Sequence, residues 1–176
     1  DLKWGCETRL DLLDNQLLEL LYKSGLRAIK VGVESVNHEL LRKHGRVPPQ
    51  IQHQEEVIKF CKKIGIKVIA FYFIGIPGDT KDSIERAIKY SQKLNTSFAN
   101  FTICTPIPGT KFYDSVKDKL TETNLNDYDH FHLVFQHDNL SKEEILDLQE
   151  KAITEFYFRP RYISRYLLDK IKAKLE

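Results

Sequence analysis

Four short segments of the sequence combine polar or turn-forming residues with the ends of apolar, strand-like runs. They are Cys6-Glu7-Thr8-Arg9, Val33-Glu34-Ser35, Gly75-Ile76-Pro77-Gly78-Asp79 and Thr105-Pro106-Ile107-Pro108-Gly109-Thr110. Carboxylates such as Glu7 and Glu34 accept hydrogen bonds from ribose hydroxyls or an ammonium group. The glycine and proline turns let a ligand approach backbone N–H and C=O groups, which can read the edge of a base. The four segments could therefore hold one ligand if the fold brings them together.

The elements that must position these segments alternate between helices and strands. Two near-repeats, 23–33 and 63–73, each end a helical pattern at a glycine and then enter an apolar run, as in the αβ loops of a βα-repeat fold. We expect strands at 3–6, 27–34, 66–74 and 99–105, and helices at 10–24, near 37–44, at 50–64, at 80–94 and near 110–119. Because the carboxyl ends of parallel strands share one edge, this order would gather the four segments there.

The C-terminal third of the sequence departs from this alternation. Residues 121–140 are polar and irregular apart from a strand-like run at 131–135, and a capping box of Ser141 and Glu144 opens a helix to about 157. Pro160 interrupts the pattern, and a basic helix closes the chain. We therefore divide the chain into a barrel part, 1–120, and a segment with a helical extension, 121–176.

The fold class that follows is α/β, a partial TIM-like (β/α) barrel of about four parallel strands with a C-terminal helical extension. The strands are almost continuously apolar, which is typical of parallel strands buried on both faces. In helix 10–24, Leu13, Leu17, Leu20 and Leu21 would form the buried face. Four βα units cannot close a barrel, so we expect an upstream part and an unpaired sheet edge.

Composition excludes several classes of protein. The 176 residues are 41% hydrophobic and 30% charged, the profile of a soluble globular chain, and no apolar run reaches the roughly 20 residues that span a bilayer. The net charge of +2 comes from 27 basic and 25 acidic residues, so a nucleic-acid footprint would have to be local, and we do not expect a nucleic-acid partner.

Cysteine usage and the first residue add two expectations. Cys6, Cys61 and Cys104 are widely separated and have no CxxC spacing, which indicates a cytoplasmic setting and no metal site built from them. The chain starts at Asp1 and contains no methionine. We interpret it as a piece of a longer chain.

The motifs in this order resemble the C-terminal half of the radical S-adenosylmethionine (SAM) core domain, most closely its cobalamin-binding-domain-associated branch. The residues concerned are W-x-C-E-T-R at 4–9, G-V-E-S at 32–35 followed by Arg46, F-I-G-I-P-G-D-T at 73–80, T-P-I-P-G-T at 105–110 and F-Y-F-R-P at 156–160. The resemblance covers nearly the whole chain in the expected order. Asp79 stands where relatives usually have glutamate.

The resemblance implies SAM-binding roles for residues at the first two strand ends. Glu7 and Arg9 would contribute polar groups near the methionyl part of SAM. Glu34 would hydrogen-bond the ribose with Ser35 beside it, and Arg46 would pair with the SAM carboxylate.

The resemblance likewise assigns the adenine to the last two strand ends. Phe73 would pack near the adenine, Gly75 and Pro77 would shape its pocket, and the strand 101–105 with Thr105 would offer backbone contacts to its edge.

Each assignment has a structural alternative. Glu34 could cap the next helix with Ser35, and Arg9 could pair with Asp11 or Asp14 on the surface. Arg46 could be a solvated charge and Phe73 plain core. For Asp79 we favour capping of the helix that follows.

The resemblance also defines what this chain lacks. The three cysteines that hold the family's 4Fe–4S cluster, and the glycine-rich segment that meets the SAM amino group, would lie upstream of Asp1. The parent would cleave SAM to a 5′-deoxyadenosyl radical that abstracts hydrogen from a small-molecule substrate, leading to methyl transfer or oxidative cyclisation, with cobalamin as a further compatible cofactor. The piece alone would be inactive.

Two other functions compete with this reading. A non-catalytic βα-barrel binding module would have no cysteine cluster upstream. A phosphate-binding barrel enzyme would use GIPGDT as an anion cradle, but the loop lacks the P-loop lysine and serine spacing, and Asp79 would repel a phosphate.

Two polar features have simpler explanations than a binding site. His130, His132 and His137 have no fixed metal-ligand spacing and are interpreted as loop residues. The basic tail carries an apolar stripe of Tyr162, Ile163, Tyr166, Leu167 and Ile171, which favours packing against the barrel or a neighbouring domain over binding tRNA.

Overall fold

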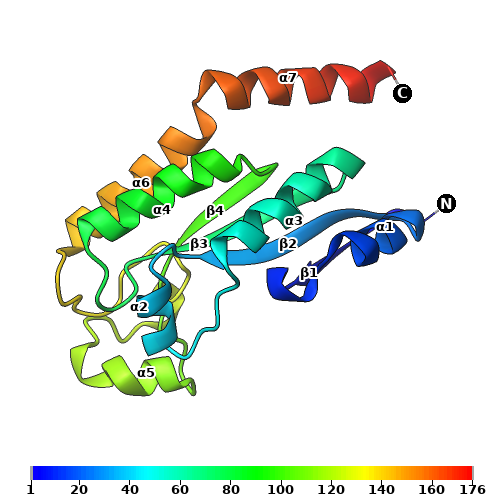
Figure 1. Cartoon of the computed structure of the whole chain (residues 1–176). Coiled ribbons are helices and arrows are strands. Elements are labelled where there is room, and N and C mark those ends of the chain that lie inside the picture. The colour runs from blue at the N-terminus through cyan, green and yellow to red at the C-terminus, as the bar shows by residue number, and fades with distance from the viewer. Residues whose placement is uncertain (1, 176) are drawn as a thin grey trace.

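A four-stranded, fully parallel sheet in the order β1-β2-β3-β4 forms the centre of the molecule. The computed structural model describes residues 2–175, with side chains up to residue 171. The strands are β1 (Trp4–Thr8), β2 (Leu26–Glu34), β3 (Lys67–Ile74) and β4 (Phe98–Ile103). The predicted α/β fold with about four parallel strands is therefore confirmed, and β1 and β4 are the edges of the sheet (Figure 1).

Helices connect and follow the strands. They are α1 (Asn15–Lys23), α2 (His38–Lys43), α3 (Ile51–Ile64), α4 (Lys81–Leu94), α5 (Lys111–Val116), α6 (Lys142–Tyr157) and α7 (Pro160–Leu175), with short 3-10 helices at Leu10–Leu12, Lys117–Lys119 and Leu125–Asp127. Apart from the first helix, the helices predicted up to residue 157 begin within a residue or two of their expected positions.

Local side-chain chemistry explains where the helices begin and end. The predicted capping box of Ser141 and Glu144 opens α6, and a second one, of Thr80 and Ser83, opens α4. Gly65 ends α3 in the left-handed conformation, with φ +86°, as the repeat pattern predicted.

The predicted helix at 10–24 is wrong in its start and in its buried face. Asp14 accepts a hydrogen bond from the Leu17 amide at 2.8 Å and so caps a helix that begins only at Asn15, after a 3-10 turn. The shifted helix buries Leu18, whereas Leu17 is 38% and Leu20 is 64% exposed. An early capping residue therefore overrode the leucine periodicity.

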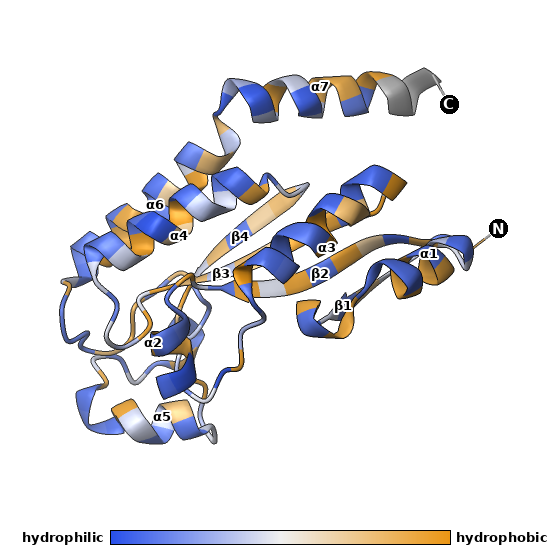
Figure 2. Cartoon of the chain, viewed as in Figure 1, coloured by the Kyte–Doolittle hydropathy of each residue, from blue (hydrophilic) through white to orange (hydrophobic). Residues whose placement is uncertain are grey.

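The helices cover one face of the sheet. Residues on alternate positions, such as Val31, Tyr72 and Phe101, join helix residues in the main core, and Figure 2 shows apolar residues along the strands. The other face carries the exposed residues Lys30 and Asn100. The expectation of burial on both faces is therefore wrong for the described residues, because side chains along each strand alternate between the helix-covered face and the uncovered face. In a complete barrel, the uncovered face lines the interior.

The C-terminal extension is helical, as predicted, and packs on the sheet through α6. Ile145, Leu148, Ala152 and Phe156 are buried in the same core as β3 and β4, and α6 lies beside α4 (Figure 1). Residues 131–135 do not form the expected strand, since they contribute only an isolated bridge from Phe135 to Leu120.

The last helix, α7, extends away from the body of the molecule (Figure 1). Tyr162 is buried and its hydroxyl donates to the Ser97 carbonyl at 3.1 Å, but Ile163, Tyr166, Leu167 and Ile171 are exposed. The predicted packing of the stripe on the barrel therefore holds only for Tyr162. Within residues 2–175, none of the helices has both the length and the apolarity needed to cross a membrane.

Candidate functional site

The carboxyl ends of the four parallel strands lie along one edge, next to α2 and α5 (Figure 1). Two cavities open there. Cavity 1, of about 440 Å³, is bounded by the ends of β1 and β2 and by residues 45–49. Cavity 2, of about 620 Å³, is bounded by the ends of β3 and β4, by α2 and by α5. Gly45 and Arg46 line both, so the two cavities adjoin.

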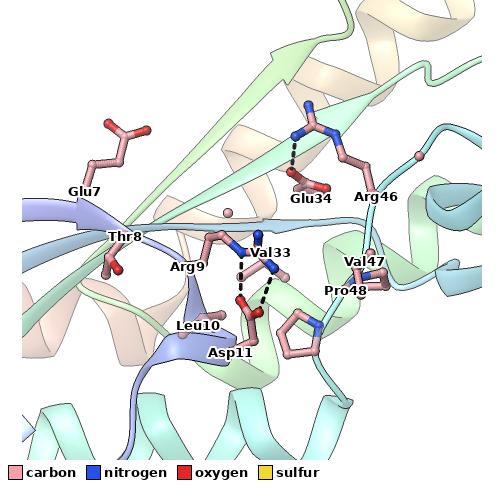
Figure 3. Close-up of a pocket in the computed structure, with 13 residues that line it drawn as sticks. Glu7, Thr8, Arg9, Leu10, Asp11, Val33, Glu34, Arg46, Val47 and Pro48 are labelled. Carbon is pink, nitrogen blue, oxygen red and sulfur yellow. Dashed lines mark hydrogen bonds and ion pairs between the residues drawn. The ribbon is translucent and has the colours of Figure 1, made fainter. Parts of the chain in front are cut away.

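Two ion pairs lie within cavity 1 (Figure 3). The Arg9 guanidinium donates to both carboxylate oxygens of Asp11, at 3.0 and 2.7 Å. Arg46 Nη1 lies 3.4 Å from Glu34 Oε1. Glu7 also lines the cavity, from β1, and is paired with neither arginine (Figure 3). Arg9 therefore forms the surface ion pair with Asp11 that we gave as its structural alternative, and it also lines the cavity.

Glu34 has an unusual backbone conformation. Its φ is +65°, in the left-handed region that few residues other than glycine adopt, and the β2–β3 register shifts between Gly32 and Glu34. A Cβ at Gly32 would lie only 3.4 Å from the Glu34 Cγ. The local backbone is therefore arranged so that this side chain folds back over β2 into cavity 1. Such strain is typical of functional positions.

Two opposing effects act on the pKa of Glu34. Burial raises the pKa of this carboxyl, although the charges of Arg46 and Arg9 oppose the shift. A ligand that donates hydrogen bonds to the carboxylate would replace the lost water.

Arg46 connects the two cavities. Besides pairing with Glu34, its guanidinium lies 5.9 Å from the centre of the Phe73 ring, at the entrance of cavity 2. Its charge is therefore partnered and not merely solvated.

Phe73, Pro77 and Thr105 all line cavity 2, and the assignment of adenine to these residues stays a prediction. The Thr105 hydroxyl donates to the Ile103 carbonyl at 3.0 Å, which holds the chain at the end of β4. Cys104 lines the same cavity, and burial raises the pKa of its thiol to about 12, so it contributes a neutral, apolar surface.

Ser35 and Gly75 line neither cavity. The buried Ser35 hydroxyl accepts a hydrogen bond from the Asn37 amide at 3.1 Å, and Asn37 itself caps α2. The idea that Glu34 caps this helix is therefore wrong. Gly75, with φ +76°, faces α6, where an added Cβ would lie 3.2 Å from the Ile145 Cδ1.

Asp79 braces the turn at 75–79 instead of capping α4. The buried carboxylate accepts from the Ile76 amide at 3.0 Å and from the Ser83 hydroxyl at 2.7 Å, while Thr80 caps the helix. Our prediction of capping by Asp79 is wrong because α4 begins at Lys81, which makes Thr80 the N-cap and leaves Asp79 one residue before it. Burial raises the pKa of this carboxyl, which its hydrogen bonds partly offset.

Three side chains that sequence reasoning did not assign to the site hold the same turn from outside. His137 Nε2 lies 3.0 Å from the Ile76 carbonyl oxygen, His44 Nε2 lies 2.9 Å from the Pro77 oxygen, and Asn139 donates to the Asp79 oxygen at 2.9 Å. No local pattern marks these contacts, because their partners are up to 61 residues away in sequence. The Nδ1 of His137 accepts from the Asn139 and Leu140 amides, so this histidine has a structural role.

The described residues do not bring the cysteines together. Cys61 is a buried residue of α3, Cys6 lies on β1 and Cys104 lines cavity 2. No group of three or more metal-ligating side chains occurs in the described part of the chain. A 4Fe–4S cluster therefore has no ligand set among these residues.

The fold is that of an α/β protein of the parallel βα-barrel class, with two adjoining cavities at the carboxyl edge of its sheet. The profile of the Radical SAM superfamily matches residues 1–91, just over half of the chain. The chain belongs to this superfamily.

Two curated relatives align along most of the chain. An uncharacterised methyltransferase of Pyrococcus horikoshii is 27% identical over 96% of this chain and 37% of its own length. The anaerobic magnesium-protoporphyrin IX monomethyl ester cyclase of Rubrivivax gelatinosus is 24% identical over 98% of this chain and 33% of its own. The chain thus spans about a third of the length of the curated relatives it matches.

Two solved structures share the fold. Escherichia coli coproporphyrinogen III oxidase, a radical SAM enzyme, superposes with a TM-score of 0.67 and 16% identity over 90% of this chain and 32% of its own. The methyltransferase TsrM from Kitasatospora setae, solved with cobalamin and a 4Fe–4S cluster, does so with a TM-score of 0.54 and 20% identity over 58% of this chain and 20% of its own. These similarities support the barrel-type architecture.

Proposed function

We propose that this chain is the part of a radical SAM enzyme that cradles SAM across the two adjoining cavities. The observation that carries the proposal is the Glu34–Arg46 pair at 3.4 Å, held at the shared edge by a left-handed backbone and lining cavity 1. Family membership supports SAM as the ligand.

The donor set of cavity 1 fits the methionyl and ribose parts of SAM. SAM carries a sulfonium, an ammonium and a carboxylate, and cavity 1 offers the carboxylates of Glu7 and Glu34 beside the cations Arg9 and Arg46. Glu34 would accept hydrogen bonds from the ribose hydroxyls, and Arg46 would pair with the ligand carboxylate. Glu7 and Arg9 would lie near the methionyl group.

Cavity 2 fits the adenine. Phe73 and the neutral Cys104 thiol supply apolar surface, and Pro77 and Thr105 bring backbone close to its edge. Ser35 and Gly75 would act indirectly, through the start of α2 and the packing of α6.

The whole protein would use SAM with a 4Fe–4S cluster whose ligands lie outside the described residues. Bound together and supplied with one electron by an external reductant, the two would generate a radical that abstracts hydrogen. The names of the relatives support methyl transfer or oxidative cyclisation on a small-molecule substrate, and the TsrM structure supports cobalamin as a further cofactor.

The partner of this part would be the N-terminal part of the same chain, in the cytoplasm. The 1–120 and 121–176 division stays a prediction.

The test uses a longer protein that includes the upstream part, reconstituted anaerobically. Glu34→Gln and Arg46→Gln should each raise the Kd for SAM about tenfold or more, because a hydrogen bond to a charged group is worth about 1.5–3 kcal/mol. The control is Arg42→Gln, an exposed residue of α2 that lines neither cavity.

The chemistry is tested by assaying 5′-deoxyadenosine from the same preparation. Its formation is expected for the wild type. An upstream part without a cysteine cluster would favour the non-catalytic binding module, whereas no deoxyadenosine from protein with an intact cluster would contradict the proposed radical chemistry. Unchanged SAM affinity in both variants would contradict the site.

A further inference from the structure

Cavity 2 differs from cavity 1 in the charge of its lining. Cavity 1 contains the carboxylates of Glu7, Asp11 and Glu34. Cavity 2 has no aspartate or glutamate among its described lining residues but contains Lys43, Arg46 and Lys111 together with His44 and His130. The lining of cavity 2 is therefore complementary to an anion.

Two of these five groups remain available to a ligand. Lys43 pairs with Glu39 at 3.2 Å, Arg46 pairs with Glu34, and His44 contacts the Pro77 carbonyl. Lys111 makes no ion pair within residues 2–171, and the ring nitrogens of His130 make no hydrogen bond there. Both side chains line the cavity and are exposed.

The backbone holds His130 firmly in place. Its φ is +70°, a left-handed conformation, and its carbonyl oxygen accepts from the Ile103 amide at 2.8 Å, next to the end of β4. Gln149 of α6 also contacts this oxygen, at 3.5 Å. The chain at 130 is thus attached to the sheet edge, which fixes where the imidazole meets the cavity.

The remainder of cavity 2 is apolar. Leu41, Ile76, Ile107 and Phe112 line it, and Phe112 is anchored by an edge contact to Phe135 with ring centres 5.8 Å apart. The cavity therefore combines an apolar lining with two polar side chains, Lys111 and His130, that have no partner among the described residues. Such a lining orients a ligand by a few polar contacts.

We propose that the part of cavity 2 lined by Lys111 and His130 binds the carboxylate of an otherwise apolar substrate. The proposal rests on the proposed function, since it places this substrate beside a SAM molecule whose adenine occupies the inner part at Phe73 and Thr105. Lys111 and His130 would determine specificity for the acid over its neutral analogue, because only the acid gains the two charge-assisted contacts.

The test uses the longer reconstituted protein with 1-naphthoate as the probe and 1-naphthamide as its neutral counterpart, with binding measured by ligand-detected NMR. Wild-type protein should bind naphthoate at least fivefold more tightly than naphthamide, with SAM present. Lys111→Gln and His130→Asn should each weaken naphthoate binding about two- to fivefold, as expected for partly exposed charges, and leave naphthamide unchanged. Asparagine tolerates the left-handed conformation at 130, so this variant preserves the fold.

The control is Lys117→Gln, which removes a charge just after α5 without touching the cavity. Equal binding of naphthoate and naphthamide, or unchanged naphthoate binding in both variants, would overturn the proposal. Displacement of naphthoate by SAM would do so too, because the probe would then occupy the adenine part. The Kd for SAM is measured on the same samples, so a failure of the SAM site is recognised separately.

Discussion

At the scale of single residues, Glu34 combines two features that lower the stability of the fold. Its φ of +65° and the burial that raises the pKa of its carboxyl both cost free energy in the folded protein. Left-handed backbone at a residue with a Cβ costs roughly 1–2 kcal/mol. Both features make sense if this carboxylate must point into cavity 1.

The pH dependence of Glu34→Gln follows from the sign of the pKa shift. A carboxyl whose pKa is raised on folding stabilises the fold below its unfolded value, near 4.5, and loses that contribution as the pH rises through the folded value. The unfolding free energy of Glu34→Gln relative to wild type should therefore increase between pH 4 and pH 7, measured by urea unfolding. A relative decrease over this range would show that the Arg46 pair outweighs the desolvation.

Asp79, unlike Glu34, is a buried acid whose hydrogen bonds stabilise the turn at 75–79. Asp79→Ala leaves the Ile76 amide and the Ser83 hydroxyl without this acceptor, which should lower the unfolding free energy by about 1–3 kcal/mol. Asp82→Ala is the matched control, because it breaks only an exposed pair with Arg86 and should cost less than about 1 kcal/mol. Equal losses in the urea midpoint would refute the bracing role.

At the scale of elements, the turn after β3 is held by segments from three other parts of the chain. The residue that follows α2 is His44, the segment before α6 contributes His137 and Asn139, and α6 itself packs against Gly75. A turn held on several sides keeps one shape, which pre-organises the backbone next to cavity 2.

Gly75→Ala tests this packing. The variant combines left-handed strain with a Cβ 3.2 Å from the Ile145 Cδ1, so it should lose roughly 2–4 kcal/mol of unfolding free energy, from strain and overpacking together. Gly109→Ala has a similar φ of +85° and nothing within 4 Å of the added Cβ, and it isolates the strain alone. Identical losses in thermal unfolding would mean that α6 does not press on the turn.

At the scale of the whole molecule, α7 is attached to the rest of the chain by cations at the end of α4. Arg159 donates to the Gln92 carbonyl at 2.8 Å, and Arg165 donates to the Asn95 and Thr96 carbonyls at 2.6 and 2.7 Å. Lys62 of α3 donates to the Leu94 carbonyl. These cations compensate the negative C-terminal end of the α4 dipole. The C-terminal extension is therefore held to the rest of the molecule by charged groups at that helix end.

The crowding of these cations predicts a pH effect at Lys62. Burial and the neighbouring charges of Arg165, Arg161 and Arg159 lower the pKa of Lys62 from 10.5 to about 8. A lysine whose pKa falls on folding destabilises the fold while it is charged, and this cost declines as the pH rises above about 8. The unfolding free energy of wild type relative to Lys62→Gln should therefore increase between pH 7 and pH 9.5. A flat difference would show that Lys62 is not in this cluster; Lys63→Gln, on the same helix, is the control.

Much of the fold was predictable from local patterns. Gly65, the Ser141–Glu144 capping box and the apolar run of β3 each mark an element through its own residues. The prediction failed where short-range signals competed, as at Asp14, where one capping hydrogen bond shifted a whole helix face. It also failed for burial of the sheet, since an apolar run does not tell how many faces are covered.

Of the candidate site residues, the sequence indicated Glu7, Arg9, Glu34, Arg46, Phe73, Pro77 and Thr105, and all of these line one of the two adjoining cavities. It did not indicate that Ser35 and Gly75 face elsewhere, nor that His137 and His130 lie near the site. These positions depend on side-chain direction and on contacts between distant segments, which periodicity does not contain.

By itself, the amino-acid sequence determined the order of strands and helices, and therefore that four polar or bent strand ends belong to one edge of a parallel sheet. The reason is that hydrogen bonds within a helix, capping residues and glycine turns act over a few neighbouring residues. Only the tertiary structure decided that Arg46 joins two cavities of opposite charge, that Glu34 adopts a strained backbone and that three distant side chains fix one turn. Those features require the chain to close over long sequence separations, where packing and burial, not local preference, select the conformation.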